Sequence, residues 1–206
     1  MGMTSSLRLG ALGLAICMLA AGASAQTTSG SASSSGNAAM AGGSGSAKLA
    51  HGDKEFIENA AQSGLFEVEQ SQLALTRTQD AGVKTFAQQM VDDHTKANQE
   101  LMSLAQSKGA KVPDKPSMTQ RGKIDLLKTH KTAFDKNYAE SQVNAHESTI
   151  KLFRKEASDG KDADLKAWAS KTLPALEHHL QMAQALKTAT GGGSMKSGST
   201  AASGSH

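Results

Sequence analysis

Apolar residues between Asp53 and Lys187 recur every three or four positions, which is the spacing of one face of an α-helix. Strands buried on one face would instead show apolar residues at every second position. The whole chain also has only three prolines, so few helices are interrupted. This pattern predicts an all-α domain, a four-helix bundle with one core, which we place at residues 51–188.

Capping and stop signals place the ends of the expected helices. Asp53 is a plausible N-cap, Gly109 is a helix stop, and Pro113 breaks the chain before a short extra helix. Asp159-Gly160 ends the third long helix, and Pro174 should kink the fourth. The expected helices are Asp53–Gln79, Ala81–Lys108, the short Thr119–Lys128, Lys131–Ser158 and Ala163–Lys187.

The first 25 residues have the pattern of a secretory signal peptide. Arg8 is followed by the apolar and small run Leu9–Gly22 and by Ala23-Ser24-Ala25, an A-x-A cleavage site. The apolar run is too short for a membrane span. We therefore expect an exported protein, periplasmic or secreted, that is cleaved near Ala25 and has no membrane span. The only cysteine, Cys17, would leave with the signal peptide.

Two segments rich in glycine, serine and alanine flank the domain, at residues 26–50 and 189–206. They have almost no bulky apolar residues, so they cannot bury enough surface to offset the entropy lost on ordering. Both are expected to be disordered. The formal net charge of +3, spread over interspersed acidic and basic residues, disfavours nucleic acid or an anionic membrane as a partner.

Four polar residues fall inside the apolar stripes, one near the middle of each long helix: Glu67, His94, His146 and His179. At about 100° per residue each one faces the core. A buried polar group is costly without a partner, so four at similar depth predict a shared site. Because all are central, the convergence holds whether the second and third long helices are joined by a hairpin or by an end-to-end crossover.

Imidazole nitrogen and carboxylate oxygen are ligands for Zn(II), Fe(II), Cu(II) or Mn(II), and the mature chain has no thiolate. We therefore predict one divalent transition metal ion held by these four residues. Asp93, Asp135 and Tyr138 are expected as its outer partners. The alternative is a hydrogen-bond network without metal that fixes helix register.

With these residues in place, the domain resembles the bacterial exported domain-of-unknown-function family 4142 of the ferritin-like superfamily. The resemblance covers nearly all of the domain and implies a ferritin-like bundle with no settled activity. Val91 and Leu176 stand where di-iron sites of that superfamily place a second row of carboxylates, which disfavours ferroxidase chemistry. The resemblance rests on Phe56, Gly64-Leu65-Phe66-Glu67, Val83-Lys84-Thr85-Phe86-Ala87, Met90-Val91-Asp92-Asp93-His94, Phe134-Asp135 with Tyr138, His146, and Leu173-Pro174-Ala175-Leu176 followed by His179-Leu180.

These observations favour a non-catalytic, metal-binding bundle over an enzyme, since the chain has no nucleophile elbow, P-loop, dinucleotide fingerprint or H-E-x-x-H motif. Two other functions stay open. One is a structural or interaction module of the cell envelope, linked to stress tolerance, without metal. The other is a redox or peroxide-handling enzyme, which would need an open coordination position.

Overall fold

The computed structural model describes residues 48–191, and these residues form helices without strands. The predicted all-α bundle is confirmed. The predicted signal peptide, nearly all of the predicted linker and most of the predicted tail lie outside the described residues. The helices are α1 (His51–Arg77), α2 (Ala81–Ser107), the short α3 (Met118–Thr129), α4 (Phe134–Asp159) and α5 (Ala163–Gly191).

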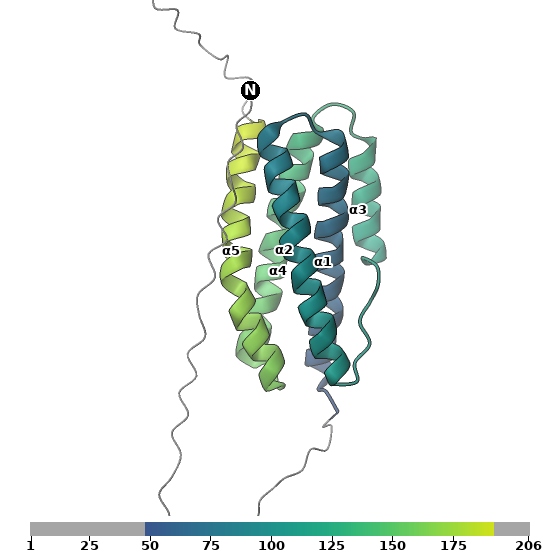
Figure 1. The fold of residues 1–206 in the computed structure, drawn as a ribbon, viewed down its shortest axis with the longest axis vertical. Helices are drawn as coiled ribbons and strands as arrows, with labels where there is room; N and C mark the ends of the chain where they lie inside the picture. The colour runs from purple at the N-terminus through teal and green to yellow at the C-terminus, as the bar shows by residue number, and fades with distance from the viewer. Residues whose placement is uncertain (1–47, 192–206) are drawn as a thin grey trace, which may run out of the picture. The chain divides into compact units, whose positions relative to one another are not determined.

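Four long helices form the bundle, and each packs against two others (Figure 1). The helix α1 lies between α2 and α4, and α5 lies between the same two helices on the opposite corner. Helices α1 and α5 run in one direction and α2 and α4 in the other (Figure 1). The polar residues in the middle of all four helices therefore face one another at the centre.

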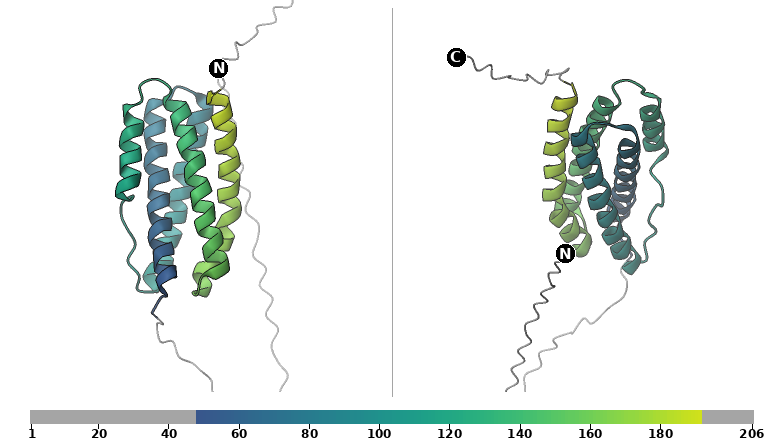
Figure 2. Two further views of the ribbon diagram at one scale, coloured as in Figure 1. Left: turned by 180° about the vertical axis from the view of Figure 1, so that it is seen from behind. Right: turned by 45° about the horizontal axis from the view of Figure 1, so that its top comes forward.

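The second and third long helices are joined by a crossover, the second of the two connections that the sequence left open. The chain leaves α2 at one end of the bundle and returns along the outside through α3 before α4 begins (Figure 2). Ile124 and Leu127 bury one face of α3 against α1 and α4. One long crossover is also the connection found in ferritin-like bundles. The ferritin-like assignment itself stays a prediction.

Backbone geometry explains where the observed boundaries differ from the expected ones. Helix α4 begins at Phe134 and not at Lys131, because Ala133 is left-handed with a φ of 60°. Helix α5 continues to Gly191 through Ala and Thr residues that are compatible with a helix. Pro174 lies inside α5 as expected, and the predicted kink stays a prediction.

Asp53 is not the N-cap of α1, which begins two residues earlier at His51. Its buried carboxylate instead accepts hydrogen bonds from the backbone N–H groups of Lys161, at 2.8 Å, and Asp162, at 3.1 Å. Both belong to the turn between α4 and α5. Asp53 therefore ties the start of α1 to that turn, a contact over long sequence separation that a local capping pattern cannot distinguish from an N-cap.

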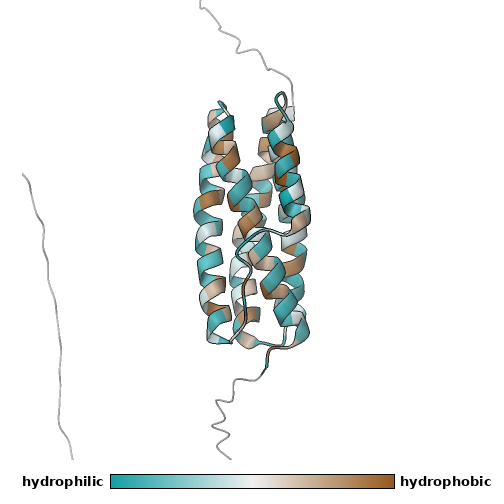
Figure 3. Cartoon of the chain, turned by 90° about the vertical axis from the view of Figure 1, so that its right-hand side faces the viewer, coloured by the Kyte–Doolittle hydropathy of each residue, from teal (hydrophilic) through white to brown (hydrophobic). Residues whose placement is uncertain are grey.

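Two apolar clusters fill the bundle, one toward each end. The first includes Phe56, Leu101 and Phe153, and the second includes Phe86 and Tyr138. Along every long helix the inward polar residue lies between members of the two clusters, for example between Met90 and Leu101 on α2 and between Val143 and Ile150 on α4. A polar layer thus divides the core. Figure 3 shows that each helix carries both hydrophilic and hydrophobic residues.

Within residues 48–191, every helix is too short or too polar to cross a membrane.

Candidate metal centre

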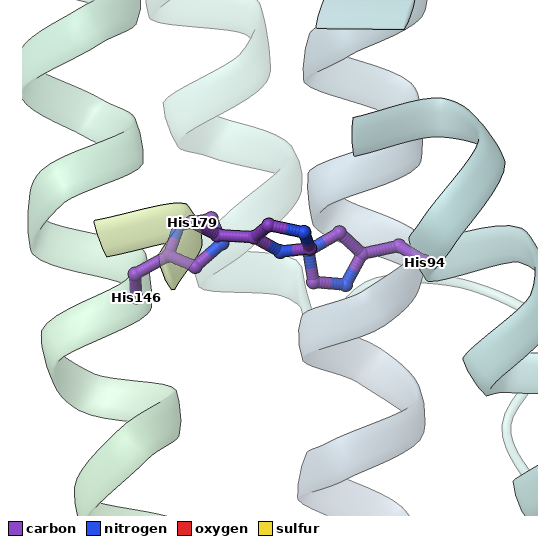
Figure 4. Close-up of side chains that lie close together, drawn as sticks. All are labelled: His94, His146 and His179. Carbon is purple, nitrogen blue, oxygen red and sulfur yellow. The ribbon is translucent and has the colours of Figure 1, made fainter. Parts of the chain in front are cut away.

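Three histidine side chains from three helices meet in the polar layer: His94 of α2, His146 of α4 and His179 of α5 (Figure 4). One ring nitrogen from each lies within 4.8 Å of the others. The ring centroids are 5.4 to 5.6 Å apart, and the rings are tilted or edge-on to one another. The rings are buried, and one nitrogen of each is out of contact with bulk solvent and has no hydrogen-bond partner among the described residues.

His146 is oriented by its own helix. Its Nδ1 lies 2.9 Å from the backbone carbonyl oxygen of Gln142, one turn earlier on α4. A carbonyl oxygen only accepts, so Nδ1 carries the proton and Nε2 keeps its lone pair. Nε2 is buried and has no hydrogen-bond partner among the described residues. The backbone therefore presents His146 as a ligand through Nε2.

His179 is oriented by a carboxylate. Its Nε2 lies 3.0 Å from Oδ2 of Asp93, which is on α2. The carboxylate accepts from Nε2–H, so the lone pair is on Nδ1, which is buried without a partner in the described part of the chain. Metal-binding histidines commonly donate their second nitrogen to a carboxylate or a carbonyl. Asp93 makes this contact to His179, and its predicted role as an outer partner of a metal stays a prediction.

All three rings are held neutral. Burial lowers the pKa of His94 well below its usual range, and the neighbouring His146 and His179 lower it further. Burial likewise lowers the pKa of His146 to about 4. The pKa of His179 is also lowered by burial, against an opposing effect of Asp93. Neutral imidazole is the form that binds a metal ion.

Glu67 is buried beside the three rings but is not one of the converging group. Its Oε1 lies 3.8 Å from Nδ1 of His146, the nitrogen that pairs with the carbonyl of Gln142. Neither carboxylate oxygen has a hydrogen-bond partner among residues 48–191. Burial raises the pKa of Glu67 to about 8. Glu67 thus lies beside His146 and outside the converging group, and its role as a fourth ligand stays a prediction.

Asp135 and Tyr138 do not contact the three histidines as the sequence predicted. Asp135 is eleven residues before His146 on α4, which is about 16 Å along the helix axis. The hydroxyl of Tyr138 pairs with Oγ of Ser71 at 2.8 Å. Both residues lie on the same helical face as His146. Residues on one face can still lie at different levels along the helix axis. Of the three residues, Asp93 alone makes a hydrogen bond to one of the histidines, and its outer role stays a prediction.

Sequence reasoning missed a polar network that supports the site from α1 and α4. Gln70 accepts from the amide of Gln142 at 3.2 Å and exchanges hydrogen bonds with Ser141 at 2.9 and 3.0 Å. Gln142 also provides the carbonyl that orients His146. The signal was present, because Gln142 precedes His146 by four residues and so lies on the same helical face.

The family model described as "Domain of unknown function (DUF4142)" matches residues 38–186. The chain belongs to this family. No curated protein and no solved structure matches the chain. The family description assigns no activity, so the chemistry of this DUF4142 domain has to be argued from its own geometry.

The three nitrogens of the DUF4142 domain can hold one ion after a small contraction. Nitrogens bound to Zn(II) at about 2.0 to 2.1 Å in a tetrahedral site are about 3.4 Å apart. Here they lie within 4.8 Å. Each ring would have to move inward by roughly an ångström, which is within the reach of small rotamer changes. Three histidines also leave one coordination position for a further ligand.

Proposed function

We propose that this protein binds one divalent transition metal ion in the core of its bundle, through Nε2 of His94, Nε2 of His146 and Nδ1 of His179. The observation that carries the proposal is the convergence of three buried ring nitrogens, each of which has no hydrogen-bond partner among the described residues. The protein's part is to pre-orient these rings and to exclude water from them.

Electrostatics support a cation at this point. The hydrogen bonds of His146 and His179 leave an acceptor nitrogen on each ring, and Nε2 of His94 is also buried without a partner among the described residues. Buried acceptors without donors are unfavourable, by roughly 1 to 3 kcal/mol each. A divalent cation would satisfy all three at once. Binding of a cation would therefore remove an energetic cost of this arrangement.

The donor set restricts the class of metal. Nitrogen ligands suit Zn(II), Cu(II), Fe(II) or Mn(II), and the described residues include no cysteine that would favour a structural zinc-thiolate site. Glu67 would contribute charge beside the site, because a bound cation favours its ionised form. We keep these four metals as the candidates.

The proposed place of action is outside the cytoplasm. The motivation is the signal-peptide pattern in residues 1–25, with cleavage near Ala25 into the periplasm or medium. Amino-terminal sequencing of protein recovered from the periplasm tests this part. A protein that keeps Arg8 and stays in the cytoplasm would contradict it.

Metal uptake is tested on full-length chain purified without a histidine tag. We expect about one equivalent of Zn(II) or Cu(II) by elemental analysis after loading and desalting. The His94→Ala variant should lose it. His178→Ala is the matched control, because His178 is an exposed neighbour of His179 on the same helix. Equal uptake by wild type and His94→Ala, or no uptake by wild type, would reject the site.

A second candidate function is a structural or interaction module of the cell envelope, related to stress, that binds no metal. The observation that favours it is the set of hydrogen bonds among Gln70, Ser141 and Gln142, with a separate pair of Ser71 and Tyr138, all between α1 and α4. Such a network can fix the register of α1 against α4. Under this function, melting would be independent of added metal.

A further inference from the structure

Asp93 is the one charged group that connects the histidine cluster to the surface among the residues described. Its Oδ2 lies 3.0 Å from Nε2 of His179, whose side chain is 4 % exposed, whereas the side chain of Asp93 is 48 % exposed. His94, His146 and Glu67 are buried, at 5 % exposure or less. Asp93 is therefore a charged side chain that an ion can reach from solvent and that also contacts the histidine cluster.

The seam between α2 and α5 carries acidic side chains at helical spacing. Glu100, seven residues after Asp93 on α2, accepts from Nε1 of Trp168 at 3.2 Å and is 3.6 Å from the ammonium of Lys171. The negative charge of Glu100 is thus partly neutralised. Among residues 48–191, Asp93 has an ion-pair contact only with His179. Unlike Glu100, the carboxylate of Asp93 has no lysine or arginine of these residues within ion-pair distance.

We propose that Asp93 is the entry residue of the metal site, which captures the hydrated cation at the surface seam between α2 and α5 and directs it to His179. The inference rests on the proposed function and adds a route to it. One carboxylate oxygen holds the ring of His179, and the other is available to a cation. A fixed negative charge at the mouth of a site raises the local concentration of cations and the rate of their association.

Two roles of Asp93 have to be separated: orienting His179 and attracting the ion. Asp93→Asn separates them, because the amide oxygen of Asn still accepts from Nε2–H while the charge is lost. Asp93→Glu keeps the charge and serves as the rescue variant. Asp92→Asn removes the same charge from the adjacent position, where Asp92 is exposed and accepts from Gln88.

The experiment mixes Zn²⁺ with full-length protein in a stopped-flow instrument and follows free ion with a zinc-sensitive dye. We expect Asp93→Asn to slow association about tenfold at low salt and to change dissociation less than about twofold. Added salt should slow association of the wild type and leave that of Asp93→Asn nearly unchanged, because salt screens the attraction. Asp93→Glu and Asp92→Asn should associate at rates within about twofold of the wild type.

Circular dichroism establishes that each variant is folded before the rates are compared. An unchanged association rate in Asp93→Asn would overturn the inference. So would a variant that only dissociates faster, since Asp93 would then merely orient His179. Failure of the wild type to take up Zn²⁺ at equilibrium would be visible before any rate is compared, and would overturn the proposed function together with the inference.

Discussion

Oε1 of Glu67 lies 3.8 Å from Nδ1 of His146, and both side chains are buried. The same ring nitrogen donates to the carbonyl of Gln142. Glu67 therefore lies beside the nitrogen of His146 that donates to Gln142, and Asp93 accepts from Nε2 of His179. Under the proposed function each of these two rings has an acidic side chain beside the nitrogen that does not bind the ion, and such outer groups tune the affinity of a metal site.

The position of Glu67 predicts a graded loss of metal affinity. Replacing Glu67 by Gln should weaken Zn(II) binding about 10- to 100-fold, the usual effect of losing an outer carboxylate. His94→Ala should abolish stoichiometric binding. Competition with a chelator of known affinity measures both. Glu69→Gln is the matched control, since Glu69 is exposed on the same helix. If Glu67→Gln removed binding as completely as His94→Ala, Glu67 would be a direct ligand.

Asp53 predicts a stability effect far from the site. Asp53→Ala should lower the free energy of unfolding by about 1 to 3 kcal/mol, because two backbone N–H groups of the turn before α5 lose their charged acceptor. Urea denaturation followed by circular dichroism measures it. Asp114→Ala, at an exposed loop position, should change the value by less than about 0.5 kcal/mol. Equal free energies of unfolding for the two variants would contradict a stabilising contact between Asp53 and this turn.

Glycines at two positions predict opposite effects of the same substitution. A Cβ at Gly160 would lie 2.6 Å from the backbone oxygen of Glu156, so Gly160→Ala should destabilise by roughly 1 to 3 kcal/mol. Gly122 lies inside α3 with nothing within 4 Å of an added Cβ. Gly122→Ala should stabilise by up to about 1 kcal/mol. Thermal melting of both variants checks the signs, and the same sign in both would refute the steric reason.

The sequence was sufficient for the inward faces of the three histidines because helical periodicity fixes which side of a helix a residue occupies. Their central positions also fixed their depth, whichever way the chain crossed from α2 to α4. The helical pattern did not give the depth of Asp135, which shares a face with His146 but lies near the start of α4. The position of the Glu67 carboxylate relative to the three rings could not be predicted either, since its direction is set by side-chain torsions that a helical pattern does not encode.

Contacts between the ends of helices were also beyond sequence reasoning. Asp53 is a residue type that commonly forms an N-cap. Only the packing of α1 beside the turn after α4 shows that its carboxylate accepts hydrogen bonds from Lys161 and Asp162. The crossover through α3 was left open for a similar reason. Helical spacing in α3 predicts a buried face but not which helices cover it.

Glu156 predicts how stability depends on pH. It is 5 % exposed, and burial, together with the nearby Asp53 and Asp162, raises its pKa to about 7. A carboxyl whose pKa is higher in the folded state stabilises the fold at low pH, and this contribution is lost as pH rises from about 4.5 to about 7. The wild type should lose stability relative to Glu156→Gln over this range, by less than about 1.4 kcal/mol per pH unit.

Chemical denaturation of wild type and Glu156→Gln at pH 5, 6, 7 and 8 gives that difference. The comparison cancels the titration of the three buried histidines, which acts in the opposite direction because their lowered pKa values make the fold less stable as pH falls below about 6.5. A difference between the two proteins that does not change with pH would show that Glu156 ionises normally.

Metal binding should raise thermal stability in a way that depends on all three rings. A ligand that binds only the folded state adds about 2.7 kcal/mol when its free concentration is a hundred times Kd. Zn(II) should therefore raise the Tm of the wild type by several degrees, and the rise should grow with free Zn(II). His146→Ala should show no rise, because the remaining two nitrogens hold an ion weakly.

In the metal-free state that variant should differ little in stability or be destabilised by about 1 to 3 kcal/mol. Calorimetry with and without Zn(II) separates the two functions: a Tm that does not respond to any of the four metals would leave the polar layer as a device that fixes helix register.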